Sequence, residues 1–425
     1  MEKKMMILGA SALQVPAIKK AKEMGYKIIL VDYDENAVGF ELADVKLVVS
    51  TLDQDEVYRQ ALIYKPDVVI TSTSDGPVRT AAYVNEKLGK KPDLSYKDSL
   101  CATIKSHMRN RLKENGVPIP KYYAVSDYEG FKEAVQKLNG YCIVKPADNA
   151  GSRGVLLVDV AEYMSGRRQT GRTDGVESKS DKYSETEQDL DNKLKNMYEY
   201  SLGNSKNGTV MVEEFMTGKE VSVEAMTVNG ETRIITITDK YITPPPYFVE
   251  LAHCEPSMLD DEVQAQIKKV ALNAIKAIEL QNGPSHTEIK ITKDGLKVVE
   301  LAARLGGDFI TSKLVPLSTG IDMVGASVQL AVGENIDIEH KCNRGAAIHF
   351  LQAEEGIIKR IIVPDEVYDL QGVEEVIIYK NAGENVHGTK SSNDRLGHII
   401  TSADTADEAM KTGKMALDMI VVETE

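Results

Sequence analysis

Residues 286–307 read HTEIKITKDGLKVVELAARLGG, and they are the most informative part of the sequence for fold and function. Two runs with alternating apolar residues flank Lys293-Asp294-Gly295, a pattern that predicts a β-hairpin with a short turn. Glu288 and Glu300 lie six residues on either side of Asp294, at positions that face each other in such a hairpin. We therefore expect their Cβ atoms to lie on one face of the hairpin, roughly 5 Å apart.

Two carboxylates at that separation repel each other, and the arrangement is costly unless a proton or a divalent cation lies between them. Oxygen ligands suit Mg²⁺, which usually binds one or two carboxylates and keeps waters or substrate phosphates. Arg304 follows Glu300 by four residues and carries a permanent positive charge that can stabilise a phosphoryl group. The stretch thus predicts a metal and phosphate site; the alternative is an edge hairpin with solvated glutamates.

The composition and charge of the chain are those of a globular protein and argue against several other classes. The chain has 425 residues, of which 42% are hydrophobic and 27% charged, as in a globular protein of two to four domains. The net charge of −14 argues against nucleic acid as a partner. The four cysteines are widely spaced, the N-terminus lacks a long apolar segment, and no run approaches the ~20 apolar residues of a membrane span. We expect a cytoplasmic protein without a membrane partner.

Three units are expected along the chain. In residues 1–95, short apolar strands alternate with amphipathic helices, which indicates a parallel α/β unit. Gly9-Ala-Ser11 and Asp32 resemble half of a Rossmann site without the full GxGxxG pattern, so a dinucleotide site competes with a small-substrate or structural role for this loop. Residues 96–332 form the second unit, and residues 333–425 form a third that consists mostly of strands.

The second unit contains two further predicted features. A helix is expected from Asp98 to about Asn115, carrying Lys105 near its middle. Residues 165–192 are polar and lack hydrophobic periodicity, so we expect a mobile surface insertion rather than a lid over the site.

A nucleotide triphosphate needs cations for its phosphates, backbone donors, an apolar slot and an acceptor for the ribose hydroxyls. Lys145 ends a predicted buried strand and faces the glycine-rich loop 148–154, while Lys105 offers a second cation. In the segment 211–220, the backbone at Glu214–Met216 can bind adenine and Glu220 can accept hydrogen bonds from ribose. The alternative for this segment is a hairpin with exposed acids.

Taken in order, these motifs resemble the ATP-grasp superfamily of carboxylate–amine ligases over nearly the whole chain. The matching parts are Lys105, Val144-Lys145-Pro146 with NAGSRG at 149–154, EEFMTGKE at 213–220, HTEIK at 286–290 and ELAARLGGD at 300–308. The resemblance implies an α/β and α+β fold, with a Rossmann-like pre-ATP-grasp domain, an ATP-grasp domain, and a mostly β C-terminal domain like that of biotin carboxylase and carbamoyl-phosphate synthase relatives.

The resemblance also assigns roles. ATP would contact Lys105, Lys145, Ser152, Gly154, Glu213, Glu214, Phe215, Met216 and Glu220. Glu288 and Glu300 would hold Mg²⁺, with Mn²⁺ as the alternative metal, and Arg304 would be the catalytic residue. One departure is Ala302, where many members of the superfamily place an Asn ligand, so the second metal position would be completed differently.

The segment Tyr241–His253 contains three prolines and resembles the substrate loop of L-amino-acid ligases of the bacilysin-synthetase type. On this resemblance Glu250 would pair with a substrate ammonium group, His253 would lie beside it, and Gly307 would also contact substrate. The alternative is a proline-stiffened loop with a surface acid. His286 either lines the same site or caps its strand.

The expected function is an ATP- and Mg²⁺-dependent ligase, which activates a carboxylate, that of an amino acid, as an acyl phosphate and joins it to an amine. Its partners would be small molecules and a second copy of the chain in a homodimer. The alternatives are an enzyme that activates bicarbonate or carbamate, like carbamoyl-phosphate synthase, and a non-catalytic ATP-binding regulatory protein. An NAD(P) dehydrogenase would leave everything after residue 95 unexplained.

Overall fold

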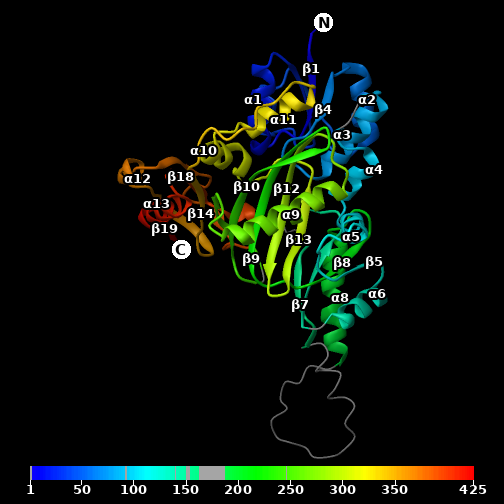
Figure 1. The fold of residues 1–425 in the computed structure, drawn as a ribbon. Helices are drawn as coiled ribbons and strands as arrows, with labels where there is room; N and C mark the ends of the chain where they lie inside the picture. Colours follow the sequence, from blue (N-terminus) through cyan, green and yellow to red (C-terminus); the bar gives the residue numbers. More distant parts are fainter. Residues whose placement is uncertain (1, 91–92, 139, 150–153, 162–186, 246) are drawn as a thin grey trace, which may run out of the picture.

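The protein is described here by a computed structural model that covers residues 2–90, 93–138, 140–149, 154–161, 187–245 and 247–425. Four sheets are formed within these ranges, and the largest has eight strands. Figure 1 shows the N-terminal unit, the unit around β5–β8 and the C-terminal unit arranged about this central sheet.

The N-terminal unit is a parallel sheet in the order β3-β2-β1-β4, which confirms the α/β prediction. Its elements are β1 (Lys4–Leu8), η1 (Ala12–Gln14), α1 (Val15–Glu23), β2 (Lys27–Asp32), η2 (Val38–Leu42), β3 (Val45–Val48), α2 (Gln54–Tyr64), β4 (Val68–Ile70) and α3 (Gly76–Lys87). The short strand β3 was not predicted. It lies at the edge of the sheet, where only one of its four side chains is buried, so its apolar pattern is weak.

The loop that follows β1 is closed by its own neighbours. Asp32 accepts hydrogen bonds from the backbone N–H of Ala10 (2.7 Å) and of Asp34 (3.0 Å). The N–H of Gly39 donates to the carbonyl of Ala10 (2.8 Å), and a Cβ on Gly39 would lie 2.7 Å from that oxygen. Because the acid and the loop backbone are engaged with each other, the structure favours the structural role of this loop over a dinucleotide site.

The second unit contains an antiparallel sheet in the order β5-β8-β6-β7. Its elements are α4 (Tyr96–Ser99), η3 (Leu100–Ala102), α5 (Lys105–Glu114), β5 (Tyr122–Val125), α6 (Tyr128–Lys137), β6 (Tyr141–Pro146), β7 (Leu156–Asp159), α8 (Glu187–Gly203) and β8 (Val210–Glu214).

The helix predicted from Asp98 to Asn115 is wrong as one element, since it is divided into α4, η3 and α5. The break falls at two β-branched residues, Thr103 and Ile104, and Ile104 has an extended backbone. The N–H of Lys105 then donates to the carbonyl of Ala147 (2.7 Å), which fixes the first turn of α5 beside the end of β6. The break therefore places Lys105 at the site.

The predicted C-terminal limit of the insertion at 165–192 is wrong, because α8 begins at Glu187. Residues 165–186 lie outside the described residues, whereas residues 187–192 form the first turns of α8. Leu190, Leu194 and Tyr198 recur every four residues on α8 and are buried against the core of this unit. The first turns of this helix were not predicted, because few apolar residues stand among the polar residues around position 187.

The central sheet has the order β13-β12-β9-β10-β11-β14-β18-β16 and combines residues before and after position 333. Its strands are β9 (Lys219–Val228), β10 (Glu231–Ile242), β11 (Glu250–Glu255), β12 (Gly283–Thr292), β13 (Gly295–Ala302), β14 (Gly345–Leu351), β16 (Val373–Ile378) and β18 (Gly397–Ala403). The C-terminal unit therefore continues the sheet that carries the glutamate hairpin. The domain boundaries at 95/96 and 332/333 stay predictions.

The remaining elements cover or extend this sheet. They are α9 (Asp261–Ala277), the π-helical turn η4 (Ile310–Leu314), α10 (Val315–Thr319), α11 (Met323–Ala331), α12 (Asp365–Asp369), η5 (Ser392–Asp394), α13 (Ala406–Met419) and the small sheet β17-β15-β19, formed by β17 (Asn385–Val386), β15 (Gly356–Ile362) and β19 (Val421–Thr424). One hydrophobic core joins the N-terminal unit to the central sheet, since Met5 and Ile18 share it with Met226 and Ile348. This packing holds the N-terminal unit beside the site.

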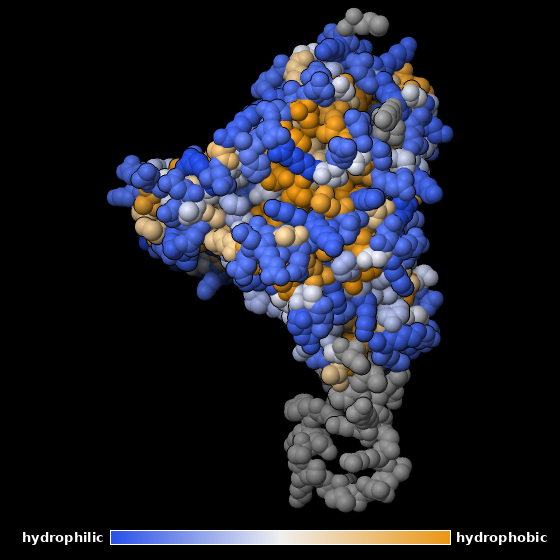
Figure 2. Space-filling view, in the orientation of Figure 1, coloured by the Kyte–Doolittle hydropathy of each residue, from blue (hydrophilic) through white to orange (hydrophobic). Residues whose placement is uncertain are grey.

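The surface in Figure 2 is mostly hydrophilic, with apolar side chains gathered where the N-terminal unit and α11 meet the central sheet. A crevice between β4, α3 and α11 is lined largely by apolar residues, among them Val69, Val78 and Ala331. Over the described residues, no single helix has the length and apolarity to cross a bilayer. The pair Ile310–Thr319 and Met323–Ala331 meets both criteria jointly but is bent by 114°.

Candidate active site

The hairpin of β12 and β13 places Glu288 opposite Glu300, as predicted. Its turn differs from the prediction, because Thr292 pairs with Gly295 and only two residues lie between them. If this register continued along the hairpin, Glu288 would lie opposite Val299. The register instead shifts by one residue between Ile289 and Glu288, and Val299 is left unpaired as a bulge. The bulge therefore restores the pairing of the two glutamates.

Charged side chains from four neighbouring strands share one face of the central sheet. The pairing of Lys240 with Glu220, and of Glu220 with Lys290, places these three residues in one row across β10, β9 and β12. Two further pairs, Glu224 with His286 and Glu288 with Glu300, extend the same face. Because side chains alternate along a strand, residues two apart face the same side. This charged face is the floor of the candidate site.

The two hairpin glutamates are each held by a lysine. Lys240 Nζ lies 2.6 Å from Glu288 Oε1, and Lys105 Nζ lies 2.7 Å from Glu300 Oε1. Burial tends to raise the pKa of Glu288, but Lys240 and His286 outweigh this effect and hold the pKa well below its usual value. Burial tends to lower the pKa of Lys105, yet Glu300 raises it above the ordinary lysine value. The positively charged side chains of Lys240 and Lys105 thus reduce the repulsion between Glu288 and Glu300, which we expected a proton or a metal ion to reduce.

The two glutamates also fit a metal site of the magnesium type. Both line two adjoining cavities, and in each ion pair the lysine contacts a single carboxylate oxygen, Oε1. In the described ranges, no cluster of three or more His, Cys, Asp or Glu residues is arranged to hold a metal by itself. A site with two carboxylates that is completed by water or phosphate oxygens suits Mg²⁺.

The first cavity contains the residues predicted to bind nucleotide. Lys145 Nζ lies 2.7 Å from Glu213 Oε2, and Arg109 binds the same carboxylate through Nε (2.8 Å) and Nη2 (3.0 Å). Although burial tends to raise the pKa of Glu213, Arg109 and Lys145 lower it to about 2. Burial is the main cause that lowers the pKa of Lys145. Glu213 therefore positions Lys145 through an ion pair, and Arg109, which has no exposed surface, fixes Glu213.

The segment after β8 contributes an apolar slot. The N–H groups of Glu214 and Phe215 donate to the carbonyls of Lys121 (2.9 Å) and Tyr141 (3.2 Å). Glu214 also pairs with Lys297 (2.9 Å), while the Met216 amide has no hydrogen-bond partner among the described residues. The Phe215 ring contacts the rings of Tyr141 and Phe248, and Ile143 and Val155 also line this cavity. These groups offer a flat apolar surface with one backbone donor beside it.

Gly154 is not among the residues that line this cavity. Its φ is +78°, and a Cβ there would lie 2.7 Å from Cβ of Asn204, so this position needs glycine for its backbone conformation and space. Ser152 lies outside the described residues. Glu220 does line the cavity, and its two oxygens pair with Lys240 (2.9 Å) and Lys290 (3.0 Å).

Arg304 lies in the second cavity and is held by the N-terminal unit. Its Nε donates to Asp75 Oδ1 (2.7 Å), and its Nη1 donates to the carbonyl of Leu305 (2.9 Å). Burial works against the charge of Arg304, but Asp75 raises its pKa further above the ordinary arginine value. Asp75 was not among the site residues predicted from the sequence. The available signal was its place in the loop after β4, since the carboxyl ends of parallel strands are where α/β sheets bind ligands.

The second cavity adjoins the first, and Lys240, Glu250, Glu288 and Glu300 line both. The other residues that line the second cavity are Asp75, His253, His286, Arg304, Gly307, Asp308, Ile310 and Ser392. All the predicted site residues that the structure describes, except Gly154, therefore line one cavity or both. Their roles stay predictions.

The proline-rich sequence suggested that Glu250 and His253 lie on a loop, but they do not. The described residues between β10 and β11, 243–245 and 247–249, belong to neither strand, whereas Glu250 and His253 both belong to β11. Tyr241 pairs with Ala252 but Ile242 pairs with Glu250, so Leu251 is a bulge. This bulge turns Glu250 to the same face as His253, three residues away.

His286 lines the second cavity from the interior of β12 and does not cap the strand. Its Nδ1 lies 2.5 Å from Glu224 Oε1, and its Nε2 lies 3.5 Å from Glu288 Oε1. Burial tends to lower the pKa of His286, but Glu224 and Glu288 raise it to about 9. His286 is therefore a buried cation at neutral pH.

His286 should make the stability of the protein depend on pH. Its pKa rises from the ordinary histidine value of 6.5 to about 9 in the folded protein, so the stabilisation is complete below pH 6.5 and is lost as pH rises through 9. At ~1.4 kcal/mol per pKa unit, the loss amounts to about 3 kcal/mol. Urea unfolding at pH 6 to 10 should show the difference between the wild type and His286→Asn shrinking with pH. His107→Asn, at an exposed position of α5, is the control, and a constant difference for His286→Asn would contradict the assignment.

Three family models match parts of this chain. Residues 174–312 match the family described as ATP-grasp domain, and residues 103–241 match the ATP-grasp (A) domain of phosphoribosylglycinamide synthetase. The chain has an ATP-grasp fold. Residues 349–425 match L-amino acid ligase C-terminal domain 2.

The relatives of this chain include ligases whose names specify amino acids as substrates. An L-arginine-specific L-amino acid ligase of Bacillus subtilis is 24% identical, over 80% of this chain and 76% of that protein. An alanine–anticapsin ligase of Bacillus subtilis strain 168 is 28% identical, over 66% of this chain and 61% of that protein. The crystal structure of an L-amino acid ligase from Bacillus licheniformis matches with a TM-score of 0.78, at 20% identity, over 100% of this chain and 99% of that one. At this identity the structural match establishes the shared fold.

Proposed function

We propose that this protein is an ATP-dependent ligase that activates the carboxylate of an amino acid as an acyl phosphate and joins it to an amine. The observation that carries the proposal is the pair of adjoining cavities that share Glu288 and Glu300. One cavity contains buried lysines beside an apolar slot, and the other contains Arg304 and acids. This arrangement suits a phosphoryl donor on one side and a carboxylate acceptor on the other.

ATP would bind in the first cavity. Adenine would lie against Phe215 and Phe248 and accept a hydrogen bond from the Met216 amide, while Lys105 and Lys145 would bind phosphate oxygens. Glu220 would accept from ribose hydroxyls. Its two oxygens already pair with lysines, but each carboxylate oxygen can accept more than one hydrogen bond.

The carboxylate acceptor would bind near Arg304. Asp75 and the carbonyl of Leu305 prevent this guanidinium from swinging away, so it is oriented before the transferring charge develops. Mg²⁺ held by Glu288 and Glu300, or Mn²⁺ in its place, would supply charge neutralisation for the phosphoryl group. An amine would then attack the acyl carbon, forming an amide and releasing phosphate. Arg304 would again face the oxygen that becomes negative.

The amino-acid class of the substrate is supported by the C-terminal match and by the relatives named above. Glu250 supports it independently, because a carboxylate in the second cavity can pair with an ammonium group of the substrate.

The proposal predicts Mg²⁺-dependent release of phosphate from ATP only when a suitable amino acid is present. Pools of the L-amino acids and of small carboxylates would be incubated with ATP, and the nucleotide product would be identified by chromatography. ADP with an amino-acid pool alone is the expected result. AMP would contradict acyl-phosphate chemistry, release with bicarbonate would favour the carbamate-forming alternative, and tight ATP binding without any release would favour a regulatory protein.

A further inference from the structure

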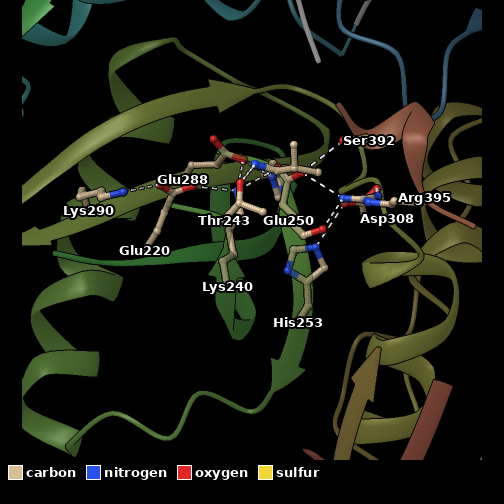
Figure 3. Close-up of polar contacts among 12 residues, drawn as sticks. Glu220, Lys240, Thr243, Glu250, His253, Glu288, Lys290, Asp308, Ser392 and Arg395 are labelled. Atoms are coloured by element: carbon tan, nitrogen blue, oxygen red, sulfur yellow. Dashed lines mark hydrogen bonds and ion pairs between the residues drawn. The ribbon is translucent and has the colours of Figure 1, made fainter. Parts of the chain in front are cut away.

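The charged groups of the second cavity are held in place by different units of the chain. Figure 3 shows Glu250 and Asp308 joined through Arg395, which belongs to the C-terminal unit. Arg304 is held from the other side of the molecule. Its Nε donates to Asp75, in the loop between β4 and α3 of the N-terminal unit. The orientation of Arg304 therefore depends on what fixes this loop.

The loop, residues 71–75, contacts the Arg304 segment at two points. Asp75 Oδ1 accepts a hydrogen bond from Arg304 Nε (2.7 Å), and the carbonyl of Ser72 accepts one from the N–H of Leu305 (3.0 Å). The carbonyl of Leu305 in turn accepts from Arg304 Nη1 (2.9 Å). Both the guanidinium of Arg304 and the backbone next to it are therefore tied to the loop, so a shift of the loop would move the positive charge in the cavity.

Gln14 binds this loop from the beginning of the chain. It is the last residue of η1 and has no exposed surface. Its Nε2 donates to Thr73 Oγ1 and to Ser74 Oγ, each at 2.9 Å, and its Oε1 accepts from the N–H of Ser72 (3.1 Å). Because a backbone N–H can only donate, the contact with Ser72 fixes which end of the amide is the oxygen. One buried side chain thus binds three consecutive residues of the loop.

The topology of the N-terminal sheet brings Gln14 to the loop. The strands β1 and β4 are parallel neighbours, so the segments that follow their carboxyl ends lie side by side. Thr71 Oγ1 donates to the carbonyl of Leu8 (2.9 Å), which is a further link between the two segments. Sequence patterns left the role of the segment after β1 open, and its contacts now connect it to the loop that holds Arg304.

We infer that Gln14 is a positioning residue of the reaction, which sets the orientation of Arg304 through residues 72–75. The inference rests on the proposed function and deepens it, because it names the residue through which the N-terminal unit acts on the site. Gln14 lines neither cavity, whereas Asp75 lines the second. A guanidinium that is oriented in advance needs no rearrangement when negative charge develops on the transferring group.

The first test is phosphate release by Gln14→Met, which keeps a side chain of similar size but makes none of the three hydrogen bonds. With the most active L-amino acid from the pool assay, kcat per folded molecule should fall at least 10-fold, because a misplacement of about 1 Å can cost about 10²-fold. The KM for ATP should change less than about two-fold, since neither Gln14 nor the loop lines the first cavity. Thermal unfolding gives the folded fraction.

The second test needs no substrate. The N–H of Leu305 donates to the carbonyl of Ser72, so its hydrogen exchange should be at least 10-fold faster in Gln14→Met than in the wild type. Gln60→Met is the matched control, because Gln60 lies in the same unit and its Nε2 donates to Glu56 within α2 (2.7 Å). It should leave both kcat and the exchange rate within about two-fold of the wild type.

Two further variants trace the route to Arg304. Thr73→Val combined with Ser74→Ala removes both acceptors of Gln14 Nε2, leaves Gln14 in place, and should also lower kcat at least about five-fold. In a protein that already carries Asp75→Ala, Gln14→Met should lower kcat less than it does alone, since residues that act as a unit are not additive.

The contrary results are distinct from one another. If Gln14→Met keeps its kcat per folded molecule, Gln14 is structural only, even where Leu305 exchanges faster. If the effects of Gln14→Met and Asp75→Ala multiply, Gln14 does not act through Asp75. If Gln14→Met does not fold, an unchanged kcat in the Thr73→Val, Ser74→Ala variant overturns the inference. If the wild type releases no phosphate with any amino acid, the proposed function fails, and the role of Gln14 in that reaction fails with it, whatever the exchange of Leu305 shows.

Discussion

Glu300→Gln should lower kcat for phosphate release by about 10²- to 10³-fold or more while the fold is retained. Gln keeps the size of the side chain but removes the negative charge. Lys105, 2.7 Å from Glu300, loses its charged partner, and the proposed metal site loses one of two carboxylates. Because β13 keeps its pairing with β12 through backbone hydrogen bonds, the hairpin should form as before.

The measurement is kcat at saturating ATP and amino acid, with circular dichroism and thermal unfolding to show that the variant is folded. Glu231→Gln is a matched control, since Glu231 is an exposed residue at the start of β10 in the same sheet. It should keep kcat within about two-fold. Near-normal turnover by Glu300→Gln would show that the proposed metal and phosphate site lies elsewhere.

Local patterns were enough to predict the glutamate pair and most elements of the three units. The hairpin is specified by a short run of residues, and its face is set by alternation. The prediction nevertheless gave the right pair only because two departures from the expected hairpin, the shorter turn and the bulge, cancel each other. The two-residue turn alone would have placed Glu288 opposite Val299, and the bulge at Val299 corrects this pairing. Beyond a bulge, each side chain of the strand points to the opposite face from the one that regular alternation predicts. The alternation of apolar and polar residues alone therefore cannot assign these side chains to a face.

The same limit applies to the substrate side. Glu250 and His253 are three residues apart, a spacing that in a regular strand puts side chains on opposite faces. The bulge at Leu251 brings them to one face. The prolines suggested a loop, but they end before the strand begins.

Residues whose partners are distant in the chain could not be predicted from local sequence patterns. Asp75 holds Arg304 across 229 residues, and Arg109 holds Glu213 across 104. Arg395 reaches Glu250 across 145 residues. No local periodicity encodes such pairs, because they depend on how separate units pack. A charged residue in a polar loop is usually solvated, so nothing in the sequence around Arg395 gives a reason to select it, whereas Asp75 had the one signal of its place after a parallel strand.

Arg109→Met should destabilise the protein by about 3–5 kcal/mol, because it leaves a buried carboxylate without its main partner. Arg109 has no exposed surface and binds both oxygens of Glu213. Its Nη1 and Nη2 also donate to the carbonyls of Val298 (3.2 Å) and Val299 (2.7 Å). Met fills a similar volume without donating a hydrogen bond, so two backbone carbonyls would lose a partner as well.

The free energy of unfolding would be measured by urea titration at pH 7, with Arg360→Met as the control for loss of a surface arginine. A second measurement separates the role of Arg109 in stability from its role at the site. Lys145 would remain as a partner of Glu213, and its pKa would no longer be lowered by the charge of Arg109. ATP affinity in Arg109→Met should therefore fall less than in Lys145→Met, which removes the proposed phosphate contact itself. If Arg109→Met cost less than about 1 kcal/mol, water would have to reach Glu213, and the carboxylate would not be the buried anchor of Lys145.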